Sequence, residues 1–488
     1  MYKRQEKHIT SDLTLPTIGA SGTTISWKSS NPSVLSNEGK VTRPKKGAAD
    51  EEVTLKGTVK MGDYAKARNF TFVVLAESEM GPTKEFALDQ VELLDDYYLT
   101  AQNSDIEFLK KFDNDRLLSR FRETAGLDTK KIAPYGGWED GWLGGHSVGH
   151  YLTAIAQAVK ATGNADLKEK SKQLIEGLAE CQNKLGTGFI FGAKIETEGY
   201  VEKQFDILEG KTTGKTWVPW YNMHKMLTGL VDTYKYTGNK QALEVAKKLG
   251  DWIYNRVSKW DAGTQGRVLG TEYGGMNDCL YELYLCTRDS KHLEAAHKFD
   301  QPNLYKTVAK GGKNCLNGKH ANTTIPKFLG ALKRYVVLEQ TGELTKDDEA
   351  YLTNVEKFFD IAVTRHAYIT GGVSVMEHFR KDNNQDGTRT QTNCESCCAH
   401  NMLKMAKELY KVTGDKKYAD YYETTLRNSI MGAVKSESGA AAYFIPMATG
   451  YFKTFGNEDP AKNMFWCCTG SGMENFTCLL YTSPSPRD

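Results

Sequence analysis

A turn that recurs through the middle of the chain constrains the fold more than any other feature. From about residue 85 to about residue 430, apolar residues repeat with a period near 3.6, as in amphipathic helices. Pairs of these helical segments are joined at TGN (162–164), TGN (237–239), TRD (287–289), TGE (341–343) and TGD (413–415). The turns are about 50 to 75 residues apart, a spacing typical of stacked helical hairpins. The chain is therefore predicted to be mainly α.

Stacked hairpins can form an open solenoid or close into a toroid, the (α/α) barrel. Polar residues recur at the start of the first helix of each hairpin, which favours the closed form with one shared pocket. These starts are GGHSVGHYL, PWYNMHKML, EYGGMNDCL, GKHANTTIPKFLG and ESCCAHNMLKM. A helical-repeat scaffold for other proteins is the competing interpretation, but it leaves these repeated polar residues unexplained.

The segments on either side of the helical region differ from it. Residues 1–77 contain short alternating runs separated by Asn, Gly and Pro turns, which predict a small β-sandwich. Residues 431–477 regain β character, and the adjacent Cys467 and Cys468 are expected on a strand there. Residues 478–488 complete neither a strand nor a helix, so we expect an unrelated tail on a chain that is truncated at its C-terminal end.

The charge balance excludes some classes of partner. The 63 lysines and arginines nearly match the 61 acidic residues, and no basic block occurs. Nucleic acid and anionic membrane surfaces are therefore not expected as partners, and no apolar run is long enough for a membrane span. An aromatic content of 11% fits a groove for a neutral polar ligand such as a sugar, and it also fits ordinary core packing.

Five of the ten cysteines gather in two clusters near the end of the chain, unlike the even spread of a disulfide scaffold. Glu395, Cys397, Cys467 and Cys468 offer one carboxylate and three thiols, enough for a tetrahedral zinc site assembled by the fold. Buried, inert thiols are the alternative. Two further cysteines, Cys394 and Cys398, are competing ligands.

Other polar and aromatic residues are candidates for a sugar pocket. Glu377 follows a Gly-Gly turn and lies between apolar neighbours, a setting that can raise the pKa of a carboxyl group for general acid catalysis. A solvated loop glutamate is the alternative. Histidines lie at several helix starts, where each is a structural histidine or a sugar ligand, and an aromatic cluster nearby can stack on a sugar or belong to the core: His146, His150, His224, His320, Trp217, Trp220 and Tyr221.

Taken in order, these segments resemble the β-L-arabinofuranosidases of glycoside hydrolase families 127 and 146, and family 146 more closely. The resemblance covers about residues 85–477 and is carried by GHSVGHYLTAIA, EYGGMNDCLYELY, HANTTIPKFLGALKRY, GGVSVMEHF, ESCCAHNMLKMAKELY and FWCCTGSGMEN, among others. Residues 1–77 resemble the bacterial immunoglobulin-like modules of polysaccharide enzymes.

The resemblance implies a fold and a reaction. It implies an (α/α)6 barrel over residues 85–430, followed by β-sandwich domains. It also implies an exo-acting, retaining glycosidase that releases β-L-arabinofuranose from plant glycans, with a cysteine nucleophile bound to Zn²⁺. Carried over by position, the zinc ligands are Glu395, Cys397, Cys467 and Cys468, the nucleophile is Cys467 and the acid/base is Glu377. The implied or candidate substrate contacts are His150, Trp220, Tyr221, His224, Glu272, His320 and Tyr443.

Cys398, Ala399 and His400 depart from the family pattern at this point of the ESCC motif, which puts the pocket or the zinc ligation in doubt. A related glycosidase for another sugar, and a non-catalytic glycan-binding protein with structural cysteines, are the alternative functions. The immunoglobulin-like module suggests an extracellular, cell-surface or periplasmic bacterial protein, although no signal peptide is evident.

Overall fold

The computed structural model describes residues 7–9, 12–19, 22–45, 48–74, 76, 85–193, 200–435, 437–455 and 464–477. The expected tail, residues 478–488, lies outside these ranges. The chain divides into two compact units, Met1–Lys84 with Leu409–Asp420, and Glu85–Glu408 with Tyr421–Asp488.

The N-terminal unit is built on a four-stranded sheet with strand order β1-β4-β3-β2. The strands are β1 (Lys7–Ile9), β2 (Thr24–Ser29), β3 (Glu51–Met61) and β4 (Tyr64–Val74); β1 is parallel to β4, and the other pairs are antiparallel. Alternate residues of β3 point into the core, where Val53 and Leu55 are fully buried with Leu35 and Val74. Among the described residues, one sheet covered by short irregular segments takes the place of the expected sandwich of two sheets.

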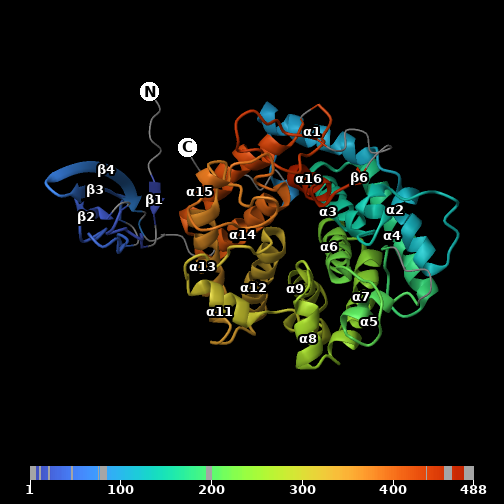
Figure 1. The fold of residues 1–488 in the computed structure, drawn as a ribbon. Helices are drawn as coiled ribbons and strands as arrows, with labels where there is room; N and C mark the ends of the chain where they lie inside the picture. Colours follow the sequence, from blue (N-terminus) through green and yellow to red (C-terminus); the bar gives the residue numbers. More distant parts are fainter. Residues whose placement is uncertain are drawn as a thin grey trace. The chain divides into compact units, whose positions relative to one another are not determined.

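The second unit is helical, and its helices follow one another in pairs (Figure 1). The longer helices of the chain are α1 (Asp96–Lys110), α2 (Asn114–Ala125), α3 (His146–Thr162), α4 (Ala165–Leu185), α6 (Pro219–Thr237), α7 (Lys240–Val257), α9 (Met276–Thr287), α12 (Ala321–Thr341), α13 (Glu349–His366), α14 (Ser396–Thr413), α15 (Lys416–Thr425) and α16 (Cys467–Thr477). The shorter ones are α5 (Lys203–Leu208), α8 (Ala262–Leu269), α10 (Ser290–His297) and α11 (Pro302–Ala309).

The recurring turn of the sequence ends one helix and begins the next. Gly163 and Gly238 adopt left-handed backbone angles (φ 70° and 71°) at the C-termini of α3 and α6. The side chains of Asn164 and Asn239 then accept hydrogen bonds from the first backbone N–H groups of α4 and α7. Arg288 replaces glycine in the third turn, with φ 56°. The helical hairpins predicted from these turns are confirmed.

The first helices of the hairpins form a closed ring. α3 packs on α6, α6 on α9, and α9 on α12. Asn322 of α12 and Asn401 of α14 share a hydrogen bond of 3.0 Å, α14 contacts α16 through His400 and Asn475, and α16 returns to α3. This ring of six helices is the inner layer of an (α/α)6 barrel, and the solenoid alternative is wrong.

The β segment predicted over residues 431–477 is wrong at the cysteine pair, Cys467 and Cys468, which lies in a helix. Its paired strand β6 has two residues, Met464–Phe465, parallel to β5 (Gly136–Gly137), and Cys467 then begins helix α16. Gly470 and Gly472 lower the helix propensity of this segment. These glycines allow α16 to pack closely against its neighbours, since a Cβ on Gly470 would lie 2.4 Å from Cδ2 of His150. Tertiary packing therefore overrides local propensity.

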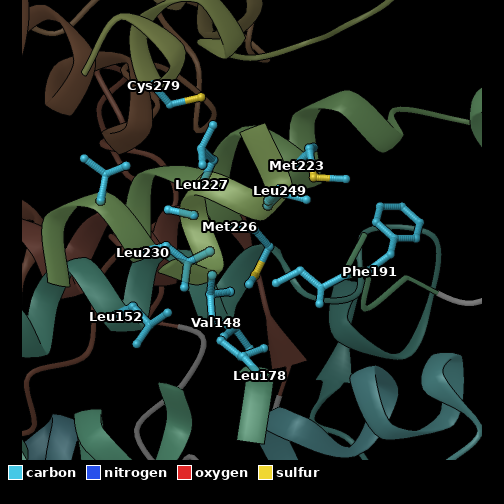
Figure 2. Close-up of a cluster of buried hydrophobic side chains, with 14 of the residues drawn as sticks. Val148, Leu152, Leu178, Phe191, Met223, Met226, Leu227, Leu230, Leu249 and Cys279 are labelled. Atoms are coloured by element: carbon cyan, nitrogen blue, oxygen red, sulfur yellow. The ribbon is translucent and has the colours of Figure 1, made fainter. Parts of the chain in front are cut away.

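An extensive apolar core supports this ring. Figure 2 shows part of it, where α3 and α4 contribute Val148, Leu152 and Leu178, and α6 and α7 contribute Met226 and Leu249. All five are 0–1% exposed. Because side chains this well packed fix the helices against one another, the polar residues at the helix starts are held in place. Across the described ranges, every helix is too short or too polar to cross a lipid bilayer.

Candidate active site

A buried group of one carboxylate and three thiols lies where α14 meets α16. Glu395 directly precedes α14, Cys397 lies in its first turn, and Cys467 and Cys468 begin α16. The exposed fractions are 0% for Glu395, 4% for Cys397, 3% for Cys467 and 1% for Cys468. One donor atom from each lies within 4.8 Å of all the others. The fold therefore brings together the four residues that the sequence analysis nominated.

The donor set fits a zinc ion. With Zn–S bonds of about 2.3 Å, two sulfur atoms of a tetrahedral site lie about 3.8 Å apart. The Sγ atoms of Cys467 and Cys468 are 3.8 Å apart, and Oε1 of Glu395 is 3.8 Å from Sγ of Cys467 and 3.9 Å from Sγ of Cys468. The Sγ atoms of Cys397 and Cys468 are closer, 3.1 Å, and would separate when both bind a metal.

Cys467 differs from its neighbours in its protonation. Hydrogen bonds from the thiols of Cys397 and Cys468 hold the pKa of Cys467 well below its usual value. Burial raises the pKa of Cys397, of Cys468 and of the Glu395 carboxyl group. A bound cation would favour the ionised form of all four groups.

Glu377 faces Cys467 across one hydroxyl group. Its backbone has φ 64°, in a tight turn from Ser374 to His378 where Met376 also has positive φ. The hydroxyl of Tyr443 donates to Oε1 of Glu377 and lies 3.5 Å from Sγ of Cys467. The other carboxylate oxygen of Glu377 lies 3.2 Å from Nε2 of His320. The Glu377 side chain is 30% exposed, so it faces an accessible space.

The expected rise in the pKa of Glu377 does not occur. The hydrogen bond from His320 lowers this pKa, burial opposes the change, and the bond from Tyr443 lowers it further. Burial disfavours the charged form of His320, but the hydrogen bond with Glu377 and the charge of Glu272 outweigh burial and raise its pKa. The apolar neighbours of Glu377 in the sequence suggested a raised pKa. The two hydrogen-bond donors that lower it come from distant segments, so the local sequence did not reveal them.

Two more nominated residues, Glu272 and Tyr221, lie near this centre, and a third, His224, lines an internal cavity together with His150 and Glu474. Nδ1 of His224 accepts a hydrogen bond of 3.0 Å from the backbone N–H of Gly275, so its proton is on Nε2. The Glu272 pKa is raised by burial, and the charges of His320 and Cys467 act on it. The Tyr221 pKa is raised by burial and then by the charge of Cys467.

Two nominated residues do not line the space between Cys467 and Glu377. Trp220 is 0% exposed and packs in the core, with ring centroids 4.9 Å from Phe205 and 5.1 Å from Phe299. Its assignment as a substrate contact is wrong, because α6 turns this position away from the barrel interior. His150 is 2% exposed, and its Nδ1 contacts Glu474 of α16.

Two residues near the site, Glu139 and Trp138, were not singled out from the sequence. Glu139 accepts backbone N–H groups of Gly145 and Ser147 and lies 2.9 Å from Nδ1 of His146, whose charge helps to lower the pKa of Cys467. Trp138 packs against the cysteine cluster. No sequence signal marks Glu139 as functional, since an acidic residue before a helix is common.

Cys398, a competing ligand in the sequence analysis, is outside the four-residue group. Its thiol donates to Oε2 of Glu395 at 3.2 Å. The thiol therefore orients the carboxylate whose other oxygen faces Cys467 and Cys468. Cys394 lies in a separate apolar cluster with Ala433, Ala442 and Ile445.

Comparison with known proteins supports this description. Residues 90–479 match the family described as "Beta-L-arabinofuranosidase, GH127 catalytic domain", and residues 2–77 match the atrophied bacterial Ig domain. The comparison with curated proteins found no match.

Two of the similar solved structures are β-arabinofuranosidases. A GH127 β-arabinofuranosidase aligns at 18% identity with a TM-score of 0.59, over 82% of this chain and 62% of the other. A GH127 β-L-arabinofuranosidase from Geobacillus stearothermophilus T6 aligns at 17% identity with a TM-score of 0.57, over 80% and 64%. The chain thus spans a little over three-fifths of the length of these structures. At these identities the structures establish a shared fold, and the comparisons do not separate families 127 and 146.

Proposed function

The chain belongs to the GH127 β-L-arabinofuranosidase catalytic-domain family, and from that premise we propose that it is a retaining exo-glycosidase that releases β-L-arabinofuranose. Cys467 is the nucleophile and Glu377 is the acid/base. Glu395, Cys397, Cys467 and Cys468 hold one Zn²⁺.

One observation carries this proposal: a single hydroxyl group contacts both proposed catalytic residues. Because the same hydroxyl oxygen contacts both residues, Sγ of Cys467 and Oε1 of Glu377 lie within about 6 Å of each other. Retaining glycosidases hold their two catalytic groups about 5–5.5 Å apart, and inverting enzymes need more room for a water molecule. The shared Tyr443 hydroxyl, 3.5 Å from the sulfur, therefore supports retention.

In the first step, the Cys467 thiolate attacks the anomeric carbon, and the bond from that carbon to the leaving oxygen breaks. Glu377 gives its proton to the leaving oxygen, and the product is a thioglycoside on Cys467. Since the pKa of Glu377 is low and that of His320 is raised, this proton is shared between them and returns to Glu377 as the leaving oxygen develops charge. When bound, Zn²⁺ keeps the thiols ionised and fixes their direction.

In the second step, Glu377 takes a proton from a water molecule whose oxygen attacks the same carbon. The carbon–sulfur bond breaks and Cys467 leaves as the thiolate. Two inversions leave the sugar with its original anomeric configuration. The Tyr443 hydroxyl, in contact with both residues, stabilises whichever of them carries the charge.

The remaining polar residues suit a single furanose ring. The Nε2–H of His224 is a donor, Glu272 an acceptor and Tyr221 an apolar wall. We propose L-arabinofuranose at the non-reducing end of plant oligosaccharides or polysaccharides as the substrate class. The match to a bacterial Ig domain supports export to the periplasm, the cell surface or the medium of a bacterium.

The test is hydrolysis of aryl glycosides by the purified chain. A β-L-arabinofuranoside should be cleaved, with the β-anomer of the sugar appearing first in the NMR spectrum. Cys467→Ser and Glu377→Gln should each lower kcat by at least about 10³-fold. Preference for another glycoside in the panel, or an inverted first product, would contradict the proposal.

A further inference from the structure

Helix α16 delivers two of the three thiols of the site, yet its sequence is a poor helix former. It contains two glycines and begins one residue after the two-residue strand β6. Its position depends on contacts with α3 and α14, because short helices of this kind are not stable alone. The placement of Cys467 and Cys468 therefore depends on whatever holds α16.

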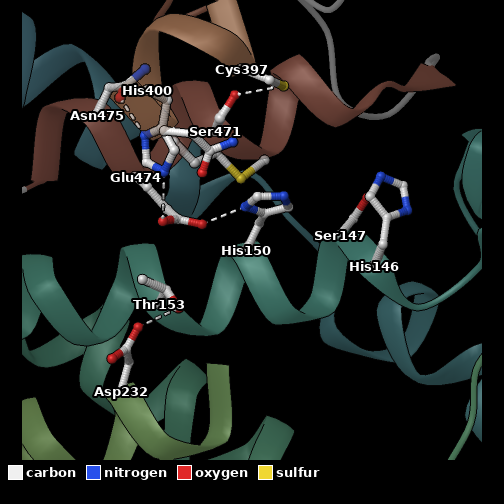
Figure 3. A network of polar contacts seen from close by, with 12 residues as sticks. His146, Ser147, His150, Thr153, Asp232, Cys397, His400, Ser471, Glu474 and Asn475 are labelled. Atoms are coloured by element: carbon white, nitrogen blue, oxygen red, sulfur yellow. Dashed lines mark hydrogen bonds and ion pairs between the residues drawn. The ribbon is translucent and has the colours of Figure 1, made fainter. Parts of the chain in front are cut away.

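One face of α16 carries both the thiols and a second set of polar residues. Cys467 and Glu474 are seven residues apart, two helical turns, and so lie on the same face about 10 Å from each other. Between them, the Ser471 hydroxyl lies 3.1 Å from Sγ of Cys397 (Figure 3). The site and the Glu474 cluster therefore form one continuous seam between α16 and α14.

Glu474 joins α16 to both neighbouring inner helices. Oε1 accepts from Nδ1 of His150 on α3, and Oε2 lies 3.4 Å from Nε2 of His400 on α14 (Figure 3). The other nitrogen of His400 donates to Oδ1 of Asn475 at 2.7 Å. Because Cys397 and His400 are three residues apart on α14, they face α16 at successive turns.

The carboxylate of Glu474 is buried near two lysines and a second carboxylate, Asp278. The Glu474 side chain is 9% exposed. Lys225 and Lys404, from α6 and α14, line the same narrow internal cavity as Glu474, His150 and His400. The contacts of this carboxylate are directional, since each oxygen contacts an imidazole from a different helix.

We infer that Glu474 is a positioning residue that fixes α16 in register with α3 and α14 and thereby sets the spacing of Cys467 and Cys468 from Glu395 and Cys397. The metal-binding part of this inference rests on the proposed function. The part about the helix does not, because it concerns the contacts of Glu474 with His150 of α3 and His400 of α14.

The first measurement is amide hydrogen exchange of residues 467–477 in the metal-free chain. Glu474→Gln should raise exchange in α16 by at least about 10-fold relative to the amides of α9, because the carboxamide loses one of the two acceptors. The matched control is Glu282→Gln on α9, whose carboxylate likewise bridges two side chains from other helices, Lys235 and Lys333, at 2.6 Å each. If α16 exchange rises no more in Glu474→Gln than in Glu282→Gln, the inference is overturned.

A second pair of variants covers the case in which Glu474→Gln does not fold. His400→Gln keeps a donor near the position of Nε2, and His400→Leu has none. His400→Leu should raise α16 exchange, and His400→Gln should restore values close to those of the parent. Equal exchange in the two variants would overturn the inference.

Zinc affinity, measured by competition with a chromophoric chelator, separates this inference from the proposed function. Glu474→Gln should bind zinc about 10- to 100-fold more weakly than the parent, as for other residues that orient ligands, while Glu282→Gln keeps the parent affinity. Zinc bound equally well by parent and Glu474→Gln overturns the positioning role and leaves the proposed site standing. A parent that binds no zinc overturns the metal site, and hydrogen exchange still decides the role of Glu474.

Discussion

Replacing Tyr443 with phenylalanine tests whether its hydroxyl couples the two proposed catalytic residues. The variant loses a hydrogen bond to a carboxylate and a 3.5 Å contact with the Cys467 sulfur, while the ring remains beside the cysteine cluster. A hydrogen bond to a charged group contributes about 1.5–3 kcal/mol. Since about 1.4 kcal/mol corresponds to a tenfold change in rate, we expect kcat to fall about 10- to 150-fold. The KM should change less, because the hydroxyl acts on charge that develops in the transition state.

The pH dependence of kcat gives an independent test of the same contact. The hydrogen bond from His320 and then the bond from Tyr443 hold the pKa of Glu377 below its usual value. Removing the Tyr443 hydroxyl raises this pKa, so the limb of the kcat profile set by Glu377 should move to higher pH.

Tyr151→Phe is the matched control, because the Tyr151 hydroxyl donates to the backbone oxygen of Leu109 within the core. It should lose about 1 kcal/mol of stability and keep its pH profile. A Tyr443→Phe enzyme with unchanged kcat and an unmoved limb would refute the shared-hydroxyl argument.

Three further outcomes are expected. Gly470→Ala should weaken zinc binding and lower the melting temperature, because its new Cβ would lie 2.4 Å from the His150 ring; parent-like values would contradict the close packing of α16. Trp220→Ala should lower the free energy of unfolding in urea by about 3–5 kcal/mol, while Trp217→Ala, at a site 51% exposed, should lower it by less than about 1 kcal/mol. Burial lowers the pKa of His366 to about 4 from the 6.5 of an exposed histidine. The unfolded chain therefore binds this proton more readily than the folded chain does. The free energy of unfolding should fall by up to about 3 kcal/mol as the pH drops from 6.5 to 4. His366→Gln should show a shallower dependence on pH in the same urea titrations.

The sequence was sufficient to predict the helical barrel, because its hairpin turns carry local signals. The glycine that ends α3 or α6 and the asparagine that caps α4 or α7 act within a few residues, so the pattern predicts them. The polar helix starts likewise indicated that the hairpins close around one pocket.

The sequence was misleading where distant contacts decide the structure. The segment from Cys467 to Thr477 is poor in helix-forming residues and is helical because it fills the sixth position of the inner ring. Trp220 is an aromatic residue of the kind that stacks on sugars. Only the packing of Phe205 and Phe299 around it shows that it belongs to the core. The low pKa of Glu377 depends on partners far away in sequence.

The most direct test of the central claim is to trap the sugar on Cys467. In Glu377→Gln, an aryl β-L-arabinofuranoside with a good leaving group can still react, because its departure needs no proton, but the second step lacks its base. Mass spectrometry of the digested protein should then show one pentose, less water, attached to the peptide that contains Cys467, and Cys467→Ser in the same background should abolish it. Steady turnover with no adduct, or an adduct on another residue, would contradict the assignment of Cys467 as the nucleophile.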